Sequence, residues 1–219
     1  MEALKRMKSM SLDEVLRDVE RLKVEAVERV NALKPKERVS RSTYLVTLYC
    51  PRCLIRTYRY TSNQLRRVKP VCTTCWVELR VVDDEFKRRY TELLESYAST
   101  VETILRPAWR ILRNWWIETG VETMPCEVEL YSVTVSFENP SHLKIYIEDG
   151  EVRAYMYLHW LRSDQLEKLE HVISVLRSTK IKALIEVDPR WDHCQIPPEG
   201  MERLGFKMGL RYWRLEIQP

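Results

Sequence analysis

Four of the six cysteines form two closely spaced pairs, and this is the pattern in the sequence that most clearly indicates chemistry. Two residues separate Cys50 from Cys53 and Cys72 from Cys75, and 18 residues separate the pairs. A two-residue gap lets a tight turn aim both sulfur atoms at one ion, and the longer insert brings the second pair from the opposite side. The spacing predicts one Zn²⁺ bound by Cys50, Cys53, Cys72 and Cys75.

The predicted zinc ion is structural, because four thiolates fill its tetrahedral coordination, whereas catalytic zinc keeps a position for water or substrate. The alternative is a set of four unpaired or redox-active thiols. A segment this short buries little apolar surface, so metal binding worth about 10–16 kcal/mol would decide whether it folds. We therefore expect the loss of any one of these cysteines to unfold the segment.

Alternating or apolar runs flank the two cysteine pairs and predict strands at residues 44–49, 55–60 and 76–82. Strands joined to two cysteine knuckles resemble a zinc ribbon, and the resemblance covers residues 42–82. It carries over only the four cysteine ligands. Many ribbons have glycine directly after each knuckle, where this chain has Leu54 and Trp76.

The positive charge of the chain is concentrated in the same segment. Residues Arg41 to Arg80 contain eight Lys or Arg and one acid, a net charge of +7, whereas the whole chain carries +4. Four thiolates around Zn²⁺ would lower the charge of this segment to about +5, which is still basic. A local basic surface favours partners that carry phosphate.

Aromatic residues alternate with these cations in the sequence. The cations can bind phosphates, and bases can stack on the aromatic rings. We expect a nucleic acid, DNA or RNA, or a nucleic-acid-processing complex as the partner, with low sequence specificity because no recognition-helix pattern is present. A protein-protein adaptor and a merely solvated surface are the alternatives. The candidate nucleic-acid contacts are Arg52, Arg56, Tyr58, Arg59, Tyr60, Arg66, Arg67 and Lys69.

Two amphipathic stretches flank the ribbon. Ser11 and Glu14 form a capping box before an apolar stripe that runs to Leu33, and a second stripe runs from Phe86 to Trp115 with Pro107 inside it. We expect helices of about 23 residues each, the second ending or kinking at Pro107. They could form a hairpin that carries the ribbon, pack separately on the C-terminal domain, or self-associate as a coiled coil.

The C-terminal part alternates strands and helices. Strands are predicted at residues 128–137, 143–147, 152–158, 183–187 and 211–217, with an Asp149-Gly150 turn and a helix from about Ser163. The predicted class is α+β, a helical hairpin carrying a four-cysteine zinc ribbon followed by a mixed α+β sheet domain. The expected divisions are 1–38, 39–83, 84–119 and 120–219.

Two stretches, IEDGEVRAYMYL at 147–158 and MERLGFK at 201–207, resemble the GNAT acetyltransferase superfamily. The resemblance implies a glycine-containing loop that binds the coenzyme A pyrophosphate, but the corresponding segment, Leu161 to Leu166, has no glycine. Met201 stands where the superfamily often has a tyrosine general acid. We therefore assign no catalytic residue and expect a non-enzymatic protein, with a divergent acetyltransferase as the second alternative.

The remaining features set limits on function. The cluster Trp191-Asp192-His193-Cys194 is expected to be a loop or core segment, because adjacent residues seldom converge on one ion. Cys126 stands alone. No stretch approaches the ~18 apolar residues of a membrane span, and we expect a cytoplasmic protein with reduced thiols. Charged residues make up 31% of the chain, a composition similar to that of proteins from hot habitats.

Overall fold

The fold is mixed α+β, with a large mixed sheet and five α-helices in the part of the chain that the structure describes. This computed structural model describes residues 7–115, 122–138, 140–190 and 194–219. The chain divides into two compact units. The sheet unit contains residues 1–20, 97–146 and 152–219, and the ribbon unit contains residues 21–96 and 147–151.

The sheet unit is built on eight strands. Their spatial order is β1 (Lys8–Met10), β6 (Met124–Glu129), β7 (Ser132–Glu138), β8 (Ser141–Glu148), β9 (Glu151–Leu158), β10 (Lys182–Val187), β12 (Trp213–Ile217) and β11 (Lys207–Met208). Strands β9 and β10 run parallel, which requires a crossover, and α4 (Leu166–Ser178) supplies it. Strand β12 then pairs antiparallel with β10.

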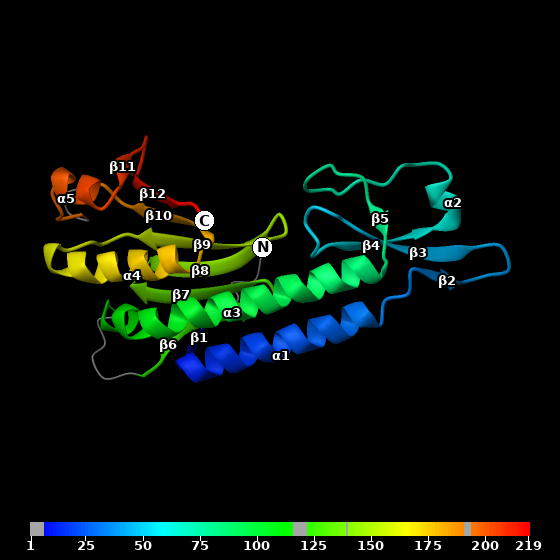
Figure 1. The fold of residues 1–219 in the computed structure, drawn as a ribbon, viewed down its shortest axis with the longest axis horizontal. Helices are drawn as coiled ribbons and strands as arrows, with labels where there is room; N and C mark the ends of the chain where they lie inside the picture. Colours follow the sequence, from blue (N-terminus) through cyan, green and yellow to red (C-terminus); the bar gives the residue numbers. More distant parts are fainter. Residues whose placement is uncertain (1–6, 116–121, 139, 191–193) are drawn as a thin grey trace. The chain divides into compact units, whose positions relative to one another are not determined.

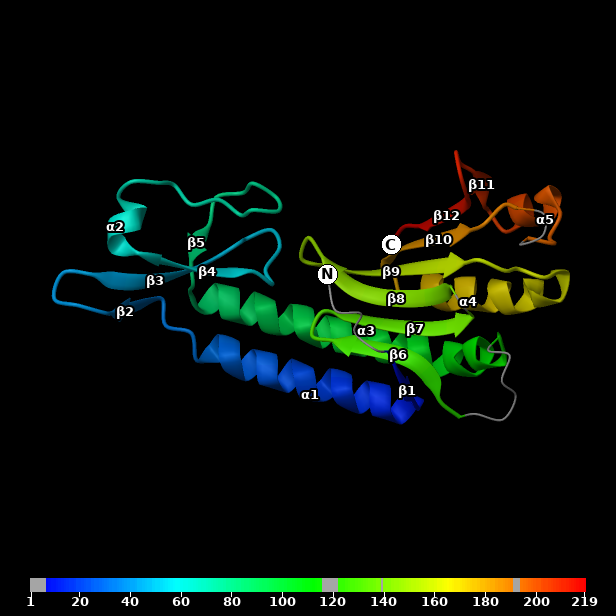
Figure 2. The same cartoon turned by 180° about the vertical axis from the view of Figure 1, so that it is seen from behind.

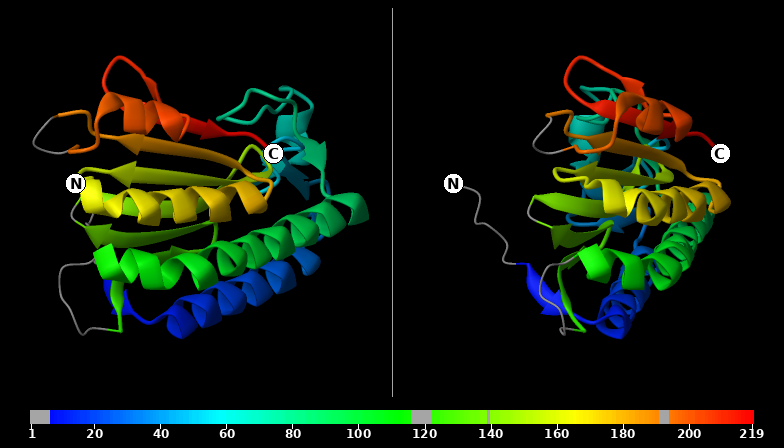
Figure 3. Two further views of the ribbon diagram at one scale, coloured as in Figure 1. Left: turned by 60° about the vertical axis from the view of Figure 1, so that its left-hand side comes forward. Right: turned by 90° about the vertical axis from the view of Figure 1, so that its left-hand side faces the viewer.

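Helices cover one face of this sheet. Figure 1 shows α4 and the C-terminal half of α3 (Asp84–Trp115) against that face, and the views in Figure 3 agree. Burial alternates along β8 and β9, so that every second side chain faces the helices. The core of this unit therefore combines alternate strand residues with one stripe of α4, including Leu143, Ile145, Met156, Val172 and Leu176.

Short elements complete the sheet unit. A 3-10 helix, η1 (Ser163–Gln165), leads into α4, and α5 (Pro198–Arg203) precedes β11. The predicted strand 128–137 was wrong as a single element, because a turn at residues 130–131 divides it into β6 and β7. Glu129 pairs with Ser132 across this turn, which contains none of the glycine, asparagine or aspartate that usually marks such turns in a sequence.

The turn between β8 and β9 follows its sequence signal. Asp149 and Gly150 both have positive φ angles, 52° and 73°. A two-residue hairpin with two left-handed residues matches the twist of the flanking strands, which is why Asp-Gly is favoured there. These turn residues belong to the ribbon unit.

The ribbon unit contains a four-stranded sheet. Strand β3 (Tyr44–Tyr49) pairs with β4 (Thr57–Thr61) along one edge, and with β2 (Lys36–Arg38) and β5 (Arg80–Val81) along the other. The predicted strand 44–49 is confirmed, whereas the predicted strand 76–82 is reduced to the two residues of β5. The short helix α2 (Ser62–Leu65) follows β4 and begins at a Thr61–Gln64 capping box.

One residue of β3 holds both ends of the ribbon. The backbone N–H of Thr47 donates to the carbonyl of Pro35 at 3.1 Å, and its carbonyl accepts from the N–H of Val82 at 3.0 Å. Thr47 is itself buried. Pro35, where the chain enters the ribbon, and Val82, where it leaves, are therefore both hydrogen-bonded to the same residue, Thr47.

The two long helices start at local signals. Helix α1 (Leu12–Asn31) begins at the predicted capping box, in which Glu14 accepts from the N–H of Ser11 at 2.7 Å and Ser11 accepts from the N–H of Glu14 at 3.4 Å. Asp83 caps α3 by accepting from the N–H of Phe86 at 2.7 Å. No helix in the described ranges is long and apolar enough to cross a membrane.

Of the two outcomes expected at Pro107, an end or a kink, the first was wrong, because α3 continues to Trp115. Proline cannot donate the bond that a helical residue makes to the carbonyl four positions earlier, here that of Thr103. On both sides of Pro107 the helix buries apolar side chains, including Ile104, Leu105, Ala108 and Leu112. Packing of this stripe outweighs the lost hydrogen bond.

Replacing Pro107 with alanine should stabilise the sheet unit. Pro107 is exposed, so the change restores a helical hydrogen bond without loss of core packing. We expect an increase of about 1–3 kcal/mol in the free energy of unfolding, measured by urea denaturation. The control is Thr103→Ala, at another exposed position of the same helix, which should change stability by less than about 0.7 kcal/mol. A destabilised Pro107→Ala protein would show that the fold requires the proline geometry.

Candidate metal centre

The two cysteine pairs form knuckles with matching backbone bonds. In the first, the N–H of Leu54 donates to the carbonyl of Cys50 at 2.9 Å, and in the second the N–H of Trp76 donates to that of Cys72 at 3.0 Å. The N–H of each leading cysteine is also bound, to the carbonyls of Arg56 and Val77. Two independent stretches of sequence thus adopt the same turn.

Each knuckle ends in a left-handed residue. Leu54 has a φ angle of 59° and Trp76 one of 58°, a region in which glycine is normally favoured. These are the positions at which many ribbons have glycine, so the turn geometry is kept although the residues differ. A non-glycine residue in this conformation costs on the order of 1–3 kcal/mol and persists where the surroundings fix it.

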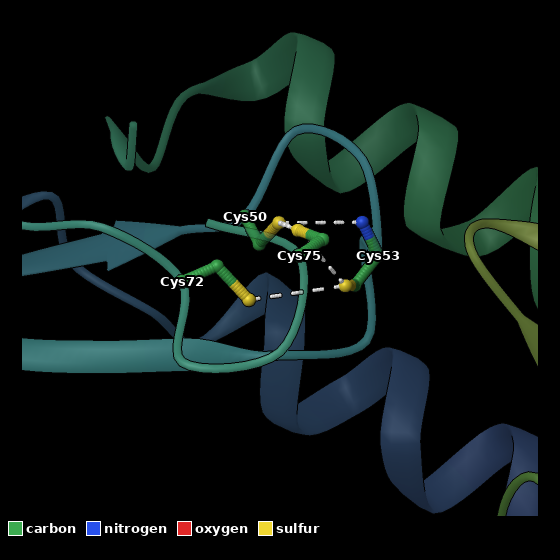
Figure 4. A group of neighbouring side chains, drawn as sticks. All are labelled: Cys50, Cys53, Cys72 and Cys75. Carbon is green, nitrogen blue, oxygen red and sulfur yellow. Dashed lines mark hydrogen bonds between the residues drawn. The ribbon is translucent and has the colours of Figure 1, made fainter. Parts of the chain in front are cut away.

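The four sulfur atoms converge on one point. All lie within 4.8 Å of one another, and Figure 4 shows the four side chains pointing inward from the two knuckles. The Sγ–Sγ distances are 3.3 Å for Cys50–Cys75, 3.6 Å for Cys53–Cys75 and 3.9 Å for Cys53–Cys72. A tetrahedral zinc with bonds of about 2.3 Å places its sulfurs roughly 3.8 Å apart. The cluster can therefore hold one metal ion of this type.

The cysteines are also the centre of the ribbon core. Its buried cluster consists of six residues, and three of them are cysteines: Val46, Leu48, Cys50, Cys53, Cys72 and Leu79. Cys75 is partly buried at its edge. Because so few aliphatic side chains contribute, the hydrophobic effect alone gives this unit little stability.

The electrostatics of the sulfurs favour a cation. Burial raises the pKa of the Cys50 and Cys53 thiols, so in isolation they stay protonated. Burial also acts to raise the pKa of Cys72, but hydrogen bonds from the Tyr58 hydroxyl and from the backbone N–H groups of Cys75 and Thr74 outweigh it and lower that pKa to about 6. Cys72 is thus prepared as a thiolate, the form that binds metal.

Tyr58 contacts the cysteine cluster. Its hydroxyl donates to the Sγ of Cys72 at 3.4 Å, from the neighbouring strand β4. The residue type alone places Tyr58 among the predicted nucleic-acid contacts, because it gives no sign of the direction in which the hydroxyl points. The alternation of β4, with Tyr58 and Tyr60 half-buried and Arg59 exposed, is the signal that separates the tyrosines from the arginine.

The other predicted contacts lie on the surface of the ribbon unit. Arg52 forms an ion pair with Asp149 at 3.1 Å, a partner that sequence reasoning missed because 97 residues separate the two. Tyr60 packs against the ribbon core beside Tyr58. The remaining cations, Arg56, Arg59, Arg66, Arg67 and Lys69, are exposed.

The two remaining cysteines do not join this centre. Cys126 and Cys194 are both buried in the sheet unit, and burial raises the pKa of each thiol. The predicted cluster Trp191-Asp192-His193-Cys194 lies outside the described residues except for Cys194. Among the described residues, the four knuckle cysteines are the one group of three or more His, Cys, Asp or Glu side chains placed to share an ion.

Comparison of the chain with known protein families, curated proteins and solved structures finds no match to any of them. The interpretation of the site therefore depends on its geometry.

Replacing Tyr58 with phenylalanine should weaken metal binding while keeping the fold. The ring remains, but the hydrogen bond that stabilises the Cys72 thiolate is lost. Loss of such a partner of a metal ligand typically lowers affinity 10–100-fold, and we expect about tenfold weaker binding in competition with a chelator. Tyr60→Phe, on the same strand, is the matched control and should bind as the unaltered protein does. Equal affinity of both variants would contradict a role for the Tyr58 hydroxyl.

Proposed function

We propose that the four cysteines bind one structural Zn²⁺ and that the ribbon so formed presents a basic surface to nucleic acid, with low sequence specificity. The zinc assignment is supported by four sulfur ligands at tetrahedral spacing and by their burial. Thiolate-only sites of this kind favour zinc over the hard cations, which prefer oxygen.

The observation that carries the nucleic-acid proposal is the exposure of cations on the insert between the two knuckles. Arg66, Arg67 and Lys69 follow α2 and precede the second knuckle, and all three are exposed. Arg56 and Arg59 are exposed nearby in sequence. The structure gives these five cations no ion-pair partner among the described residues, so their charge is available to phosphate.

The arrangement of these cations favours low specificity. They lie on a strand, a loop and the end of α2, a helix of four residues with no buried side chain. Sequence-specific readers place a longer recognition helix or a ribbon of two strands in the major groove. Contacts from arginine and lysine to the phosphate backbone fix position without reading bases.

A protein-protein adaptor is the alternative that a specific observation favours. The ribbon unit exposes several large apolar side chains, above all Trp76 at 77%, followed by Val39 at 55% and Val68 at 52%. Aromatic side chains that remain exposed beside charged residues are typical of protein interfaces. The same tryptophan can stack on a base, so salt dependence distinguishes the two alternatives better than the variant Trp76→Ala does.

We also propose that α1 and α3 act as a helical hairpin that carries the ribbon. Within the ribbon unit, Lys87 near the start of α3 donates from Nζ to the carbonyl of Asn31 at the end of α1, at 3.0 Å. A lysine that binds a helix C-terminal carbonyl also opposes the partial negative charge at that end. Buried residues on both helices, including Ala26, Val30, Phe86 and Tyr90, support this pairing.

An acetyltransferase has the least support. In the segment that would have to bind a pyrophosphate, the N–H of Arg162 donates to Oε1 of Gln165 at 2.9 Å, and the N–H of Gln165 donates to the carbonyl of Arg162 at 3.0 Å. Backbone N–H groups that already donate hydrogen bonds within the segment are not available to bind a pyrophosphate. Met201 is fully buried and carries no acidic proton. We therefore do not propose this activity.

Zinc removal should unfold the ribbon and leave the sheet unit folded. We expect about one zinc per chain by elemental analysis, and loss of that zinc from Cys53→Ser together with loss of amide-exchange protection in residues 44–81. The control is Cys126→Ala, which changes a buried cysteine of the sheet unit and should keep the zinc. Purified protein without stoichiometric zinc, or a Cys53→Ser protein that retains it, would reject the proposal.

The paired change Arg66→Ala, Arg67→Ala should weaken nucleic-acid binding. Log affinity falls linearly with log salt concentration, and the loss of two phosphate contacts should make this negative slope shallower by about 1.5 to 2. The measurement is fluorescence anisotropy with a labelled oligonucleotide. The control Arg106→Ala, Arg110→Ala removes the same charge from exposed positions of α3. If the affinity for the oligonucleotide changes neither with salt nor with the paired change Arg66→Ala, Arg67→Ala, the result would favour the protein-protein adaptor.

A further inference from the structure

The sheet unit has a second surface with a composition of its own, on the side of the sheet away from the helices. The alternation that buries Leu143 and Ile145 places the intervening residues of β8 and β9 on the opposite face. Figure 2 shows this face, and within the sheet unit α4 and the C-terminal half of α3 lie behind β8 and β9 in this view. The half-buried side chains there are His142, Lys144, Tyr146, Arg153, Tyr155 and Tyr157.

The rings on this open face contact one another. The His142 ring lies 5.7 Å from that of Tyr155 and 6.0 Å from that of Tyr157, and Tyr212 meets Tyr157 edge-on at 5.9 Å. Rings held in this way lose little further conformational freedom when a planar group stacks on them. The face therefore offers a preorganised aromatic platform.

The acidic groups beside these rings are neutralised by basic side chains and hydrogen bonds. Glu186 accepts from the Tyr155 hydroxyl at 2.8 Å and pairs with Arg214 at 2.7 Å. Asp188 pairs with Arg190 at 2.7 Å and lies 3.5 Å from the ring of His159. Both carboxylates are buried, and their ion pairs with Arg214 and Arg190 offset the negative charge that an approaching anion would meet.

One end of the platform is cationic and concave. A cavity of about 210 Å³ is lined there by Tyr146, Arg153, Lys182 and Leu184, with one acid, Glu216. Lys144 stands over the Tyr146 ring, with its Nζ 5.6 Å from the ring centre. A ring, an adjoining hollow and three cations are thus gathered around Tyr146.

We propose that the open face of the eight-stranded sheet binds single-stranded nucleic acid, with bases stacked on Tyr146 and Tyr157 and phosphates held by Lys144, Arg153 and Lys182. Aromatic side chains on an exposed sheet are a recurrent means of stacking unpaired bases, with cations following the backbone. A duplex hides its base faces and cannot use the rings. A neutral partner would gain nothing from the cations around Tyr146.

This surface lies in the sheet unit and contains none of the ribbon cations, so it can be tested with those cations removed. The background for the test is full-length zinc-loaded protein carrying Arg66→Ala and Arg67→Ala. The probes are fluorescein-labelled 12-nucleotide polypyrimidine RNA and DNA, with the corresponding duplexes as competitors. In this background we expect binding to the single strands and weak competition from the duplexes.

The variants separate the ring from the hydroxyl. Tyr146→Ala should weaken binding of the single strand about tenfold, the loss typical of one stacked base, whereas Tyr146→Phe should stay within about twofold of its parent. Lys144→Gln should make the negative slope of log affinity against log salt concentration shallower by about 0.7, as expected for the loss of one phosphate contact with a single strand. Equal affinity of Tyr146→Ala and Tyr146→Phe would overturn the proposal.

A second measurement needs no substitution at the platform. Photo-crosslinking of an oligonucleotide that contains 4-thiouridine to the otherwise unaltered protein, followed by peptide mapping, should label residues 142–157. Crosslinks confined to residues 41–80 would overturn the sheet-face site while supporting the ribbon proposal. Crosslinks confined to residues 142–157 would support the sheet-face site and count against the ribbon proposal. Crosslinks in neither segment, or equal competition by duplex, would also overturn the inference.

Discussion

Four sulfur atoms within 4.8 Å of one another, three of them on buried side chains, constrain the ribbon unit to a geometry that can hold one metal ion. Without one, burial raises the pKa of the Cys50 and Cys53 thiols, whereas hydrogen bonds lower the pKa of Cys72. With one, each becomes a strong ligand, and the two knuckles are held from opposite sides. The paired backbone bonds of the knuckles, the left-handed Leu54 and Trp76 and the small aliphatic cluster around them all follow from that constraint.

The same constraint gives the local basicity a second physical role. A divalent ion with four thiolates carries a net negative charge, and cations nearby offset it. The hydrogen bond from Tyr58 to Cys72 acts in the same direction. The exposed arginines are the residues that we assign to phosphate. The Tyr58 hydroxyl thus contacts a sulfur, whereas these arginines face solvent.

Local signals in the sequence predicted the features that depend on neighbouring residues. The convergence of the four cysteines, β3, the capping box at Ser11 and the Asp149-Gly150 turn follow from spacing and residue type within a few positions. Features decided by distant packing were not predictable in this way. Helix α3 continues through Pro107 because buried residues lie on both sides of it, and the residue 130–131 turn carries no turn residue. The direction of the Tyr58 hydroxyl and the pairing of Arg52 with Asp149 depend on tertiary contacts that sequence order does not reveal.

The paired bonds of Thr47 bear on how such a protein arises. Because Pro35 and Val82 are joined to the two polar groups of a single buried residue, the ribbon begins and ends at nearly the same place. A segment with adjoining ends can be spliced into an existing turn, or removed and closed by a few residues, without rethreading the rest of the chain. The four-cysteine segment therefore has the geometry that insertion into an existing turn in a single event requires.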